Sequence, residues 1–251
     1  MDEVILRSEG LTKSFGKFTA IDNIDLKFKS GIITSIIGPN GAGKTTAINL
    51  LTGGLHSDKG KVFFKDKDVT SLTPDQIVKH GITRSFQIMN IFQMLTVLQN
   101  VELPLLSLLD KNLKWLHTVS HYQDVAEEAE KILRELSLWD KRNKVAGELS
   151  HGDQRALEMG MAIASKPEIC FLDEPSSGMN PVERAAILEL IKRLAEEGTT
   201  TFVIIEHDMD VIFALSEWII VMNKGEILAE GKPDDIRQNN EVVEIYLGEE
   251  V

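Results

Sequence analysis

The sequence predicts an α/β fold built around a mostly parallel sheet, and three observations support this prediction. First, short apolar runs alternate along the chain with amphipathic stretches of helical period. Second, the runs 32–37, 169–172 and 200–205 are nearly continuous, as in parallel strands that are buried on both faces. Third, a glycine-rich loop joins the first run to a helical stretch. Strands and helices in alternation pack as a sheet covered by helical crossovers.

The N-terminal segment predicts antiparallel strands that precede this sheet. Segments 4–6 and 19–28 alternate in polarity and are rich in β-forming residues, and Gly10 and Gly16 between them are typical of turns. The stretch 61–70 predicts a small hairpin. We therefore expect an N-terminal antiparallel β subdomain beside the parallel sheet.

Two helices are expected around this hairpin. Apolar residues recur every three or four positions after Lys44, so a helix begins there and ends near Gly53. A short helix over 73–80 is indicated by Pro74, because proline is favoured at the first helical position.

The middle third predicts an inserted helical subdomain at about 96–154. Strand signals are few from 96 to about 138, and apolar residues form one stripe at helical spacing. The residues of this stripe are Val125, Ala129, Ile132, Leu133 and Leu136. We expect one domain, 1–251, in which about 1–95 and 155–251 form the catalytic core.

The last third continues the alternation of helices and strands. Helices are expected at 153–165, 181–197 and 209–216, and strands at 169–172, 200–205, 218–222 and 226–230. Two short helices are expected at about 233–251.

The composition is that of an acidic globular protein. Of 251 residues, 43% are hydrophobic and 26% are charged, and the formal net charge is −12. An acidic excess argues against a nucleic-acid-binding protein, which needs a basic face, and against direct docking on an anionic membrane. The apolar runs are far shorter than the roughly 20 residues of a membrane-spanning helix, and no signal peptide is evident. Any contact with a membrane is therefore expected through a partner.

Cysteine and histidine give no sign of a structural metal site. Cys170 is the single cysteine and lies in an apolar run, which indicates a small buried hydrophobic residue. His117 and His121 have the i, i+4 spacing of a metal-binding pair, but no third ligand is evident nearby. A solvated insertion is the preferred interpretation of these histidines.

A phosphate-binding loop is predicted between the first buried run and the helix that follows it. The segment matches G-x-x-x-x-G-K-[ST] at every specified position. Its residues are Gly38, Pro39, Asn40, Gly41, Ala42, Gly43, Lys44 and Thr45, with Thr46 next in the helix. The alternative is a glycine-rich turn with an incidental lysine, which the flanking strand and helix disfavour.

Each part of this loop has a chemical reason. Glycines allow backbone N–H groups to surround the β-phosphate of a nucleotide, and the helix N-terminus adds the positive end of its dipole. Lys44 can supply a positive charge to the β- and γ-phosphates, and the Thr45 hydroxyl can ligate Mg²⁺. The loop therefore predicts a P-loop NTPase core without specifying its class.

Two carboxylates, Asp173 and Glu174, follow the buried run 169–172. The carboxyl ends of strands are where α/β folds bind ligands. Asp173 can hold Mg²⁺, and Glu174 can act as a general base toward water. Alone, such a pair is more often a solvated turn, but the phosphate loop upstream favours the catalytic interpretation.

The segment Leu149-Ser150-His151-Gly152-Asp153-Gln154 resembles the signature of the ATP-binding cassette (ABC) ATPase family, usually LSGGQ. His151 and Asp153 depart from the common pattern. At a helix N-terminus, Ser150 and the backbone at Gly152 would donate hydrogen bonds to a γ-phosphate. Ser150 with Asp153 also fits an S-x-x-D capping box, and both interpretations can hold together.

The resemblance implies roles for residues that the pattern alone does not single out. Phe15 resembles the aromatic residue that stacks on adenine, with strand-edge packing as the alternative. Gln87 resembles the glutamine that contacts Mg²⁺ and water and connects to the membrane partner. His207 resembles the histidine that contacts the γ-phosphate. The cofactors implied are ATP and Mg²⁺.

The segment 176–180 resembles the family's D-loop, with Asn180 where many relatives have Asp. Asn180 also begins an N-x-x-E capping box with Pro181 and Glu183, which is a full structural explanation for it.

A closer resemblance is to the ATPases of branched-chain amino acid importers. It is carried by segments 81–87, 91–92, 94–101, 172–175, 178–181, 205–209, 229–231 and 246–249, and by the long stretch 103–124. It covers Leu11 to about Leu247. Similar ATPases serve urea or amide uptake, and others extract lipopolysaccharide. Because the ATPase does not touch the cargo, its sequence constrains the cargo only through ancestry.

The resemblance also implies partners. Two copies, or this chain and a paralogue, would form a head-to-tail dimer in which each ATP lies between the Lys44 loop of one chain and the Ser150 segment of the other. Membrane-spanning permease subunits would receive the motion from the helical subdomain. The chain would therefore be cytoplasmic, on the inner face of the cell membrane.

Three other classes are disfavoured. ABC ATPases of DNA repair or translation usually carry coiled-coil insertions or tandem cassettes. A different P-loop enzyme, such as a kinase, lacks the signature before the acidic pair. A non-catalytic scaffold need not retain Lys44, Asp173, Glu174 and His207.

Overall fold

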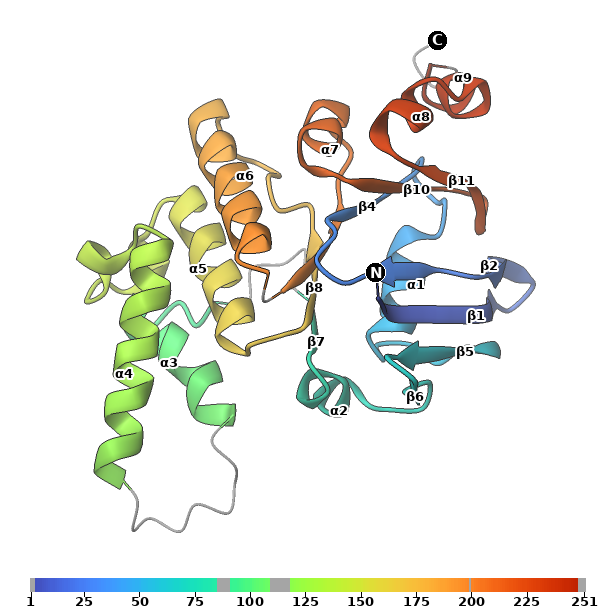
Figure 1. Cartoon of the computed structure of the whole chain (residues 1–251). Helices are drawn as coiled ribbons and strands as arrows, with labels where there is room; N and C mark the ends of the chain where they lie inside the picture. The colour runs from blue at the N-terminus through green and yellow to red at the C-terminus, as the bar shows by residue number, and fades with distance from the viewer. Residues whose placement is uncertain (1–2, 85–90, 109–117, 199, 248–251) are drawn as a thin grey trace.

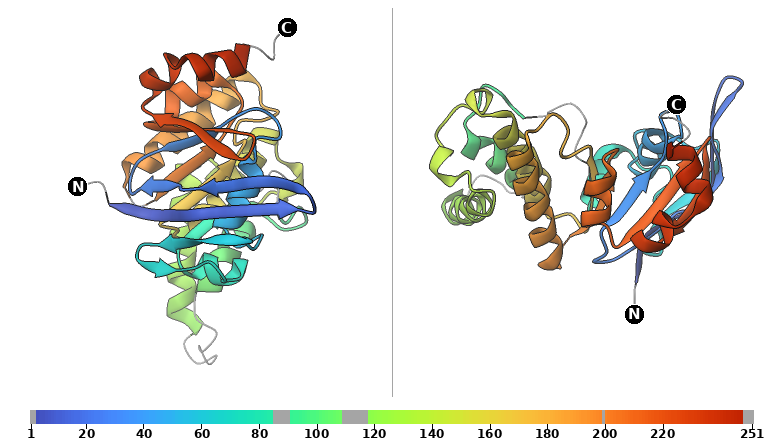
Figure 2. Two further views of the ribbon diagram at one scale, coloured as in Figure 1. Left: turned by 90° about the vertical axis from the view of Figure 1, so that its right-hand side faces the viewer. Right: turned by 90° about the horizontal axis from the view of Figure 1, so that it is seen from above.

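The computed structural model describes residues 3–84, 91–108, 118–198 and 200–247. Two β-sheets lie next to each other, and a group of helices extends from them to one side (Figure 1). Seen from above, the helices of the middle of the chain lie to one side of the sheets (Figure 2, right). The predicted α/β class is confirmed, with its parallel sheet and its additional antiparallel sheet. The subdomain boundaries stay a prediction.

The smaller sheet is antiparallel and has the strand order β2-β1-β5-β6, with β3 also paired to β1. Its strands are β1 (Val4–Phe15), β2 (Phe18–Ile24), β3 (Lys27–Lys29), β5 (Lys59–Phe64) and β6 (Lys67–Asp68). The hairpin expected over 61–70 is formed by β5 and β6.

Gly10 lies inside β1 and not in a turn. Its φ is 58°, and the register of β1 against β5 shifts between Glu9 and Thr12. The Gly10 N–H donates a hydrogen bond to Asp25 Oδ1 at 2.6 Å. The predicted turn at Gly10 was wrong, because a β-bulge uses the same positive φ that marks a turn. Gly16 does lie in the turn between β1 and β2.

The larger sheet has the order β11-β10-β4-β9-β8-β7, and every pair is parallel except β10 with β11. Its strands are β4 (Thr34–Ile37), β7 (Ile82–Arg84), β8 (Ile169–Asp173), β9 (Thr201–Ile205), β10 (Trp218–Asn223) and β11 (Glu226–Gly231). Strand β7 was not predicted, because three residues are too few to show a strand pattern. Every residue of β4, β8 and β9 is buried, as their continuous apolar runs indicated.

The helices follow the predicted order. Four of them lie between strands: α1 (Lys44–Leu51), α2 (Pro74–Lys79), α6 (Pro181–Glu196) and α7 (Met209–Leu215). Two more, α8 (Pro233–Arg237) and α9 (Asn240–Leu247), follow the last strand. The middle of the chain forms α3 (Val97–Leu108), α4 (Thr118–Glu135), α5 (His151–Ala164) and the 3₁₀ turns η1 (Trp139–Lys141) and η2 (Ala146–Glu148). Pro74 is at the start of α2, as expected.

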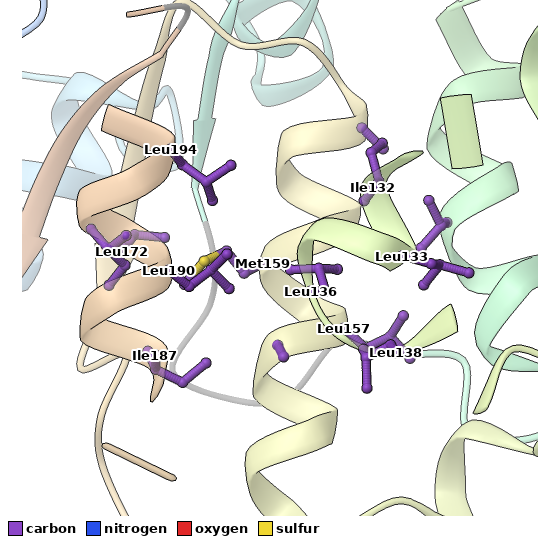
Figure 3. Packing of buried hydrophobic residues seen from close by; sticks show 14 of the residues in the cluster. Ile132, Leu133, Leu136, Leu138, Leu157, Met159, Leu172, Ile187, Leu190 and Leu194 are labelled. Atoms are coloured by element: carbon purple, nitrogen blue, oxygen red, sulfur yellow. The ribbon is translucent and has the colours of Figure 1, made fainter. Parts of the chain in front are cut away.

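One hydrophobic cluster joins the middle helices to the larger sheet (Figure 3). Leu136, which directly follows α4, and Met159 of α5 pack in the same cluster as Leu190 of α6 and Leu172 of β8. Gly160 of α5 allows this helix to approach the end of α4 closely, because a Cβ at position 160 would lie 2.3 Å from Leu136 Cδ1. Burial of each leucine contributes about 1.5–3 kcal/mol, so the cluster fixes α5 against the strands.

Candidate functional site

The glycine-rich loop between β4 and α1 is shaped by contacts with other strands. Gly38 has a φ of 151°, and a Cβ at this position would lie 2.1 Å from the carbonyl oxygen of Met222 in β10. Gly43 has a φ of 101°, and a Cβ there would lie 2.7 Å from the Ala20 carbonyl oxygen. Glycine is therefore required at both positions, by conformation and by space.

Lys44 begins α1 and is only 7% exposed. Its Nζ donates hydrogen bonds to the carbonyl oxygens of Gly38, at 2.5 Å, and Pro39, at 3.0 Å. The ammonium group is thus held against its own loop, where the loop carbonyls orient it.

A cavity of about 310 Å³ brings the loop together with the ends of two neighbouring strands. It is lined by Phe18, Ala20, Asn40, Gly41, Ala42, Gly43, Lys44, Thr45, Thr46, Asp173, Glu174, Ile205 and His207. Strands β8 and β9 pair in parallel, so the residues that follow them emerge at one edge of the sheet. The structure therefore unites most of the residues that the sequence singled out for nucleotide chemistry.

Asp173, the last residue of β8, is 3% exposed and forms a buried ion pair. Arg84 Nη2 lies 2.7 Å from Asp173 Oδ2, and Arg84 Nη1 donates a hydrogen bond to Asn49 Oδ1 of α1. One guanidinium group thus connects α1, β7 and β8. No role was predicted for Arg84, because no local pattern reveals a partner 89 positions away.

Glu174 has the unusual φ of 48° and turns its side chain toward His207. Its Oε1 lies 3.2 Å from His207 Nε2, and its N–H donates a hydrogen bond to the Ile205 carbonyl at 2.8 Å. A non-glycine residue in this conformation costs on the order of 1–3 kcal/mol and persists only when its surroundings fix it. The pair of Glu174 and His207 is therefore held by both strand ends.

The Ser150–Asp153 segment lies apart from this cavity, at the start of α5. Ser150 is the N-cap, and its Oγ accepts a hydrogen bond from the Asp153 N–H at 3.2 Å. The Asp153 carboxylate is instead 2.5 Å from Lys141 Nζ in η1. Ser150 and His151 are exposed, whereas Gly152 is buried against Glu183 of α6. The Ser150 side chain therefore caps the helix as expected, whereas the Asp153 carboxylate pairs with Lys141 and does not complete the capping box.

Asn180 caps α6 as predicted. Its Oδ1 accepts hydrogen bonds from the N–H groups of Val182, at 3.0 Å, and Glu183, at 3.1 Å. The Glu183 carboxylate accepts the Asn180 N–H in return at 3.3 Å. This completes the capping box and accounts for the asparagine at this position.

The aromatic residue predicted to stack on adenine does not line this cavity. Phe15 is 49% exposed at the end of β1, and among the described residues the aromatic one that lines the cavity is Phe18, its partner across the turn. Sequence reasoning missed Phe18, although its place two residues after Gly16, across the turn from Phe15, was a usable signal. Gln87 and His117 lie outside the described residues, as does the side chain of His121.

Comparison with known proteins gives the family. A family model described as "ABC transporter" matches residues 21–177. The chain belongs to the ABC transporter family. A second model, described as "Branched-chain amino acid ATP-binding cassette transporter", matches residues 226–251 of this cassette. No helix in the described parts of the chain is both long and apolar enough to cross a membrane.

Relatives cover the full length of the cassette. It is 37% identical over 254 residues to the high-affinity branched-chain amino acid transport ATP-binding protein LivG of Escherichia coli, covering 99% of this chain and 100% of the relative. The ADP conformation of MJ1267, an ATP-binding cassette of an ABC transporter, has a TM-score of 0.84 and 35% identity, covering 98% of this chain and 99% of that one. A dimeric post-hydrolysis structure of the cassette MJ0796, bound to ADP and Pi, has a TM-score of 0.77 and 28% identity, covering 91% and 98%.

Proposed function

We propose that this chain is the ATP-hydrolysing subunit of an importer for branched-chain or other hydrophobic amino acids. The observation that carries the proposal is the cavity in which the phosphate loop, Asp173, Glu174 and His207 meet. The full-length likeness to LivG supports the importer and its class of cargo.

In the proposed reaction, the loop residues 38–46 bind the phosphates of ATP. Lys44 releases its loop carbonyls and neutralises charge on the β- and γ-phosphates. Phe18, which lines the cavity, and Phe15, which pairs with it across the turn, offer aromatic faces to the adenine ring. The Ser150–Asp153 segment of a second chain supplies further donors to the γ-phosphate.

The residues of the cavity suit a magnesium ion. The Thr45 hydroxyl and the Asp173 carboxylate line the same cavity, and both are the hard oxygen ligands that Mg²⁺ prefers. Mg²⁺ commonly uses one or two protein ligands together with substrate phosphates. We propose that Thr45 and Asp173 hold the ion, with Gln87 as a further ligand. When bound, it would offset negative charge on the phosphates.

Glu174 is proposed as the general base for the attacking water, and His207 as its orienting partner and as a contact of the γ-phosphate. Their 3.2 Å contact keeps the Glu174 carboxylate at the cavity instead of in solvent. Proton transfer by a positioned carboxylate contributes about 10²–10⁴-fold to a rate.

A dimer and a permease complete the proposed machine. The Ser150–Asp153 segment, in which Ser150 and His151 are exposed, and the cavity occupy different parts of one chain, which fits a head-to-tail arrangement with an identical chain or a paralogue. MJ0796 is dimeric with ADP and Pi, which supports such an arrangement. We propose attachment to the inner face of the cell membrane through permease subunits only.

The test is transport in vesicles that contain the chain and its co-purified permease. Labelled leucine, urea and a lipid-linked saccharide are offered with and without Mg-ATP. We expect ATP-dependent uptake of leucine. Uptake of urea alone, or hydrolysis without any coupled movement of amino acid, would contradict the proposed cargo.

A further inference from the structure

Three consecutive residues after β9 hold the segment that follows β8. His207 contacts Glu174, as described above. Glu206 binds Ser176, and Asp208 forms an ion pair with Arg184 of α6. The stretch 206–208 therefore contacts the segment that follows β8 at three points, and His207 makes the middle contact.

The Glu206 contact is the buried one. Glu206 is 5% exposed, and its Oε1 accepts hydrogen bonds from the Ser176 N–H, at 3.0 Å, and from the Ser176 Oγ, at 2.6 Å. Its Oε2 accepts the His207 N–H at 3.3 Å. One carboxylate thus binds the residue two positions after Glu174 and the backbone of His207 itself.

The position of Glu206 matters because the turn at Glu174 is held by contacts with the end of β9 and the residues after it. Glu174 has a φ of 48°, and it contacts both Ile205, the last residue of β9, and His207, which follows that strand. Loss of Glu206 would leave two buried donors of Ser176 without an acceptor, and such groups draw in water or shift to find one. Either response would move the turn that carries Glu174.

We propose that Glu206 is a positioning residue that sets the geometry of Glu174 relative to His207 and so governs the rate of hydrolysis. This inference rests on the catalytic roles proposed above for Glu174 and His207. Glu206 does not line the cavity, so its effect is on turnover and not on nucleotide binding.

The experiment compares four variants of the full chain for steady-state hydrolysis and for equilibrium binding of a fluorescent ATP analogue. Glu206→Ala removes the acceptor, and we expect kcat to fall about 100-fold, the cost of displacing a reacting group by about 1 Å, with binding changed less than about twofold. Glu206→Gln keeps an oxygen that accepts the same two bonds, so we expect it to retain at least about one third of kcat.

Ser176→Ala and Asp208→Asn complete the set. Ser176→Ala loses only the hydroxyl bond and keeps the backbone bond, so we expect a loss of about three- to tenfold in kcat, equivalent to one hydrogen bond. Asp208→Asn is the matched control: it removes the partly exposed ion pair with Arg184 but keeps the cap of α7, since Asn is also a good N-cap. We expect its kcat to stay within about twofold.

The outcomes separate the possibilities. Unchanged kcat in a folded Glu206→Ala protein overturns the inference. An equal loss of kcat in Asp208→Asn also overturns it, because the effect would then not be specific to the buried contact between Glu206 and Ser176. A fall in ATP affinity that matches the fall in kcat also overturns it. If Glu206→Ala fails to fold, unchanged kcat in Ser176→Ala overturns it instead. Glu174→Gln is measured in the same assay, and full activity of this variant contradicts the proposed general base. If Glu174→Gln is inactive but Glu206→Ala is fully active, only the positioning role of Glu206 is contradicted.

Discussion

The phosphate-loop cavity and the Ser150–Asp153 segment are both built at the start of a helix, yet they differ in how they are enclosed. In the cavity, Lys44 and Asp173 are buried and held by partners within the chain. In the segment, Ser150 and His151 are exposed at the start of α5. The chain itself therefore preorganises one half of the proposed ATP site, while the other half is open to solvent, as the proposed dimer requires.

The largest effect is expected from Lys44→Ala. Loss of this ammonium group should weaken ATP binding by about 2–5 kcal/mol, the range for truncating one partner of a buried charged contact. The measurement is a fluorescence titration of the monomer with an ATP analogue. Lys131→Ala, on the exposed face of α4, is the matched control and should bind normally. Normal binding by Lys44→Ala would show that the loop is not the phosphate site.

Glu174→Gln should separate binding from turnover. Without a general base, kcat should fall at least about 100-fold while ATP affinity is retained. Because ATP then persists, a dimer should accumulate on size-exclusion chromatography with Mg-ATP. Brisk hydrolysis by this variant would contradict the proposed base, and an ATP-loaded monomer at every concentration would contradict the shared site.

A smaller effect is expected at the Ser150–Asp153 segment, where Lys141 pairs with Asp153. Lys141→Gln leaves the Asp153 carboxylate without its partner at 2.5 Å, next to the predicted position of a phosphate. In the Glu174→Gln background, we expect about fivefold more ATP to be needed for half-maximal dimer formation, as for a partly exposed ion pair. Binding to the monomer should not change.

The double variant Lys141→Gln/Asp153→Asn should recover dimer formation, because it removes both charges. Lys131→Gln serves as the control for loss of a lysine elsewhere. If the double variant dimerises as poorly as Lys141→Gln alone, the lysine acts by a route other than neutralising Asp153.

The smallest effect concerns stability alone. Asn180→Ala removes the cap of α6 and should lower the free energy of unfolding by about 1 kcal/mol, as measured by urea denaturation. Asn180→Asp keeps the cap and should be nearly as stable as the parent. Equal destabilisation by both changes would argue that the amide group itself has another role.

The sequence predicted the elements that repeat a simple pattern and missed those that depend on distant contacts. Asp173 was recognisable because it ends a buried apolar run downstream of the phosphate loop, whereas the role of His207 came from the family resemblance. The Arg84 pair with Asp173 and the three-residue strand β7 could not be predicted, since both are fixed by partners far along the chain. The wrong turn at Gly10 has the same origin, because a bulge is defined by the neighbouring strand.

The contact between Gly38 and Met222 has a consequence for how the protein is made. The phosphate loop contacts Met222 of β10 at Gly38. It also contacts Gly225, whose N–H donates a hydrogen bond to the Ala42 carbonyl at 3.0 Å. These partners leave the ribosome roughly 180 residues after the loop, which at about 5–20 residues per second is on the order of 10–40 seconds. The nascent chain therefore carries a phosphate loop without these contacts for most of its synthesis, and they form only near the end of translation.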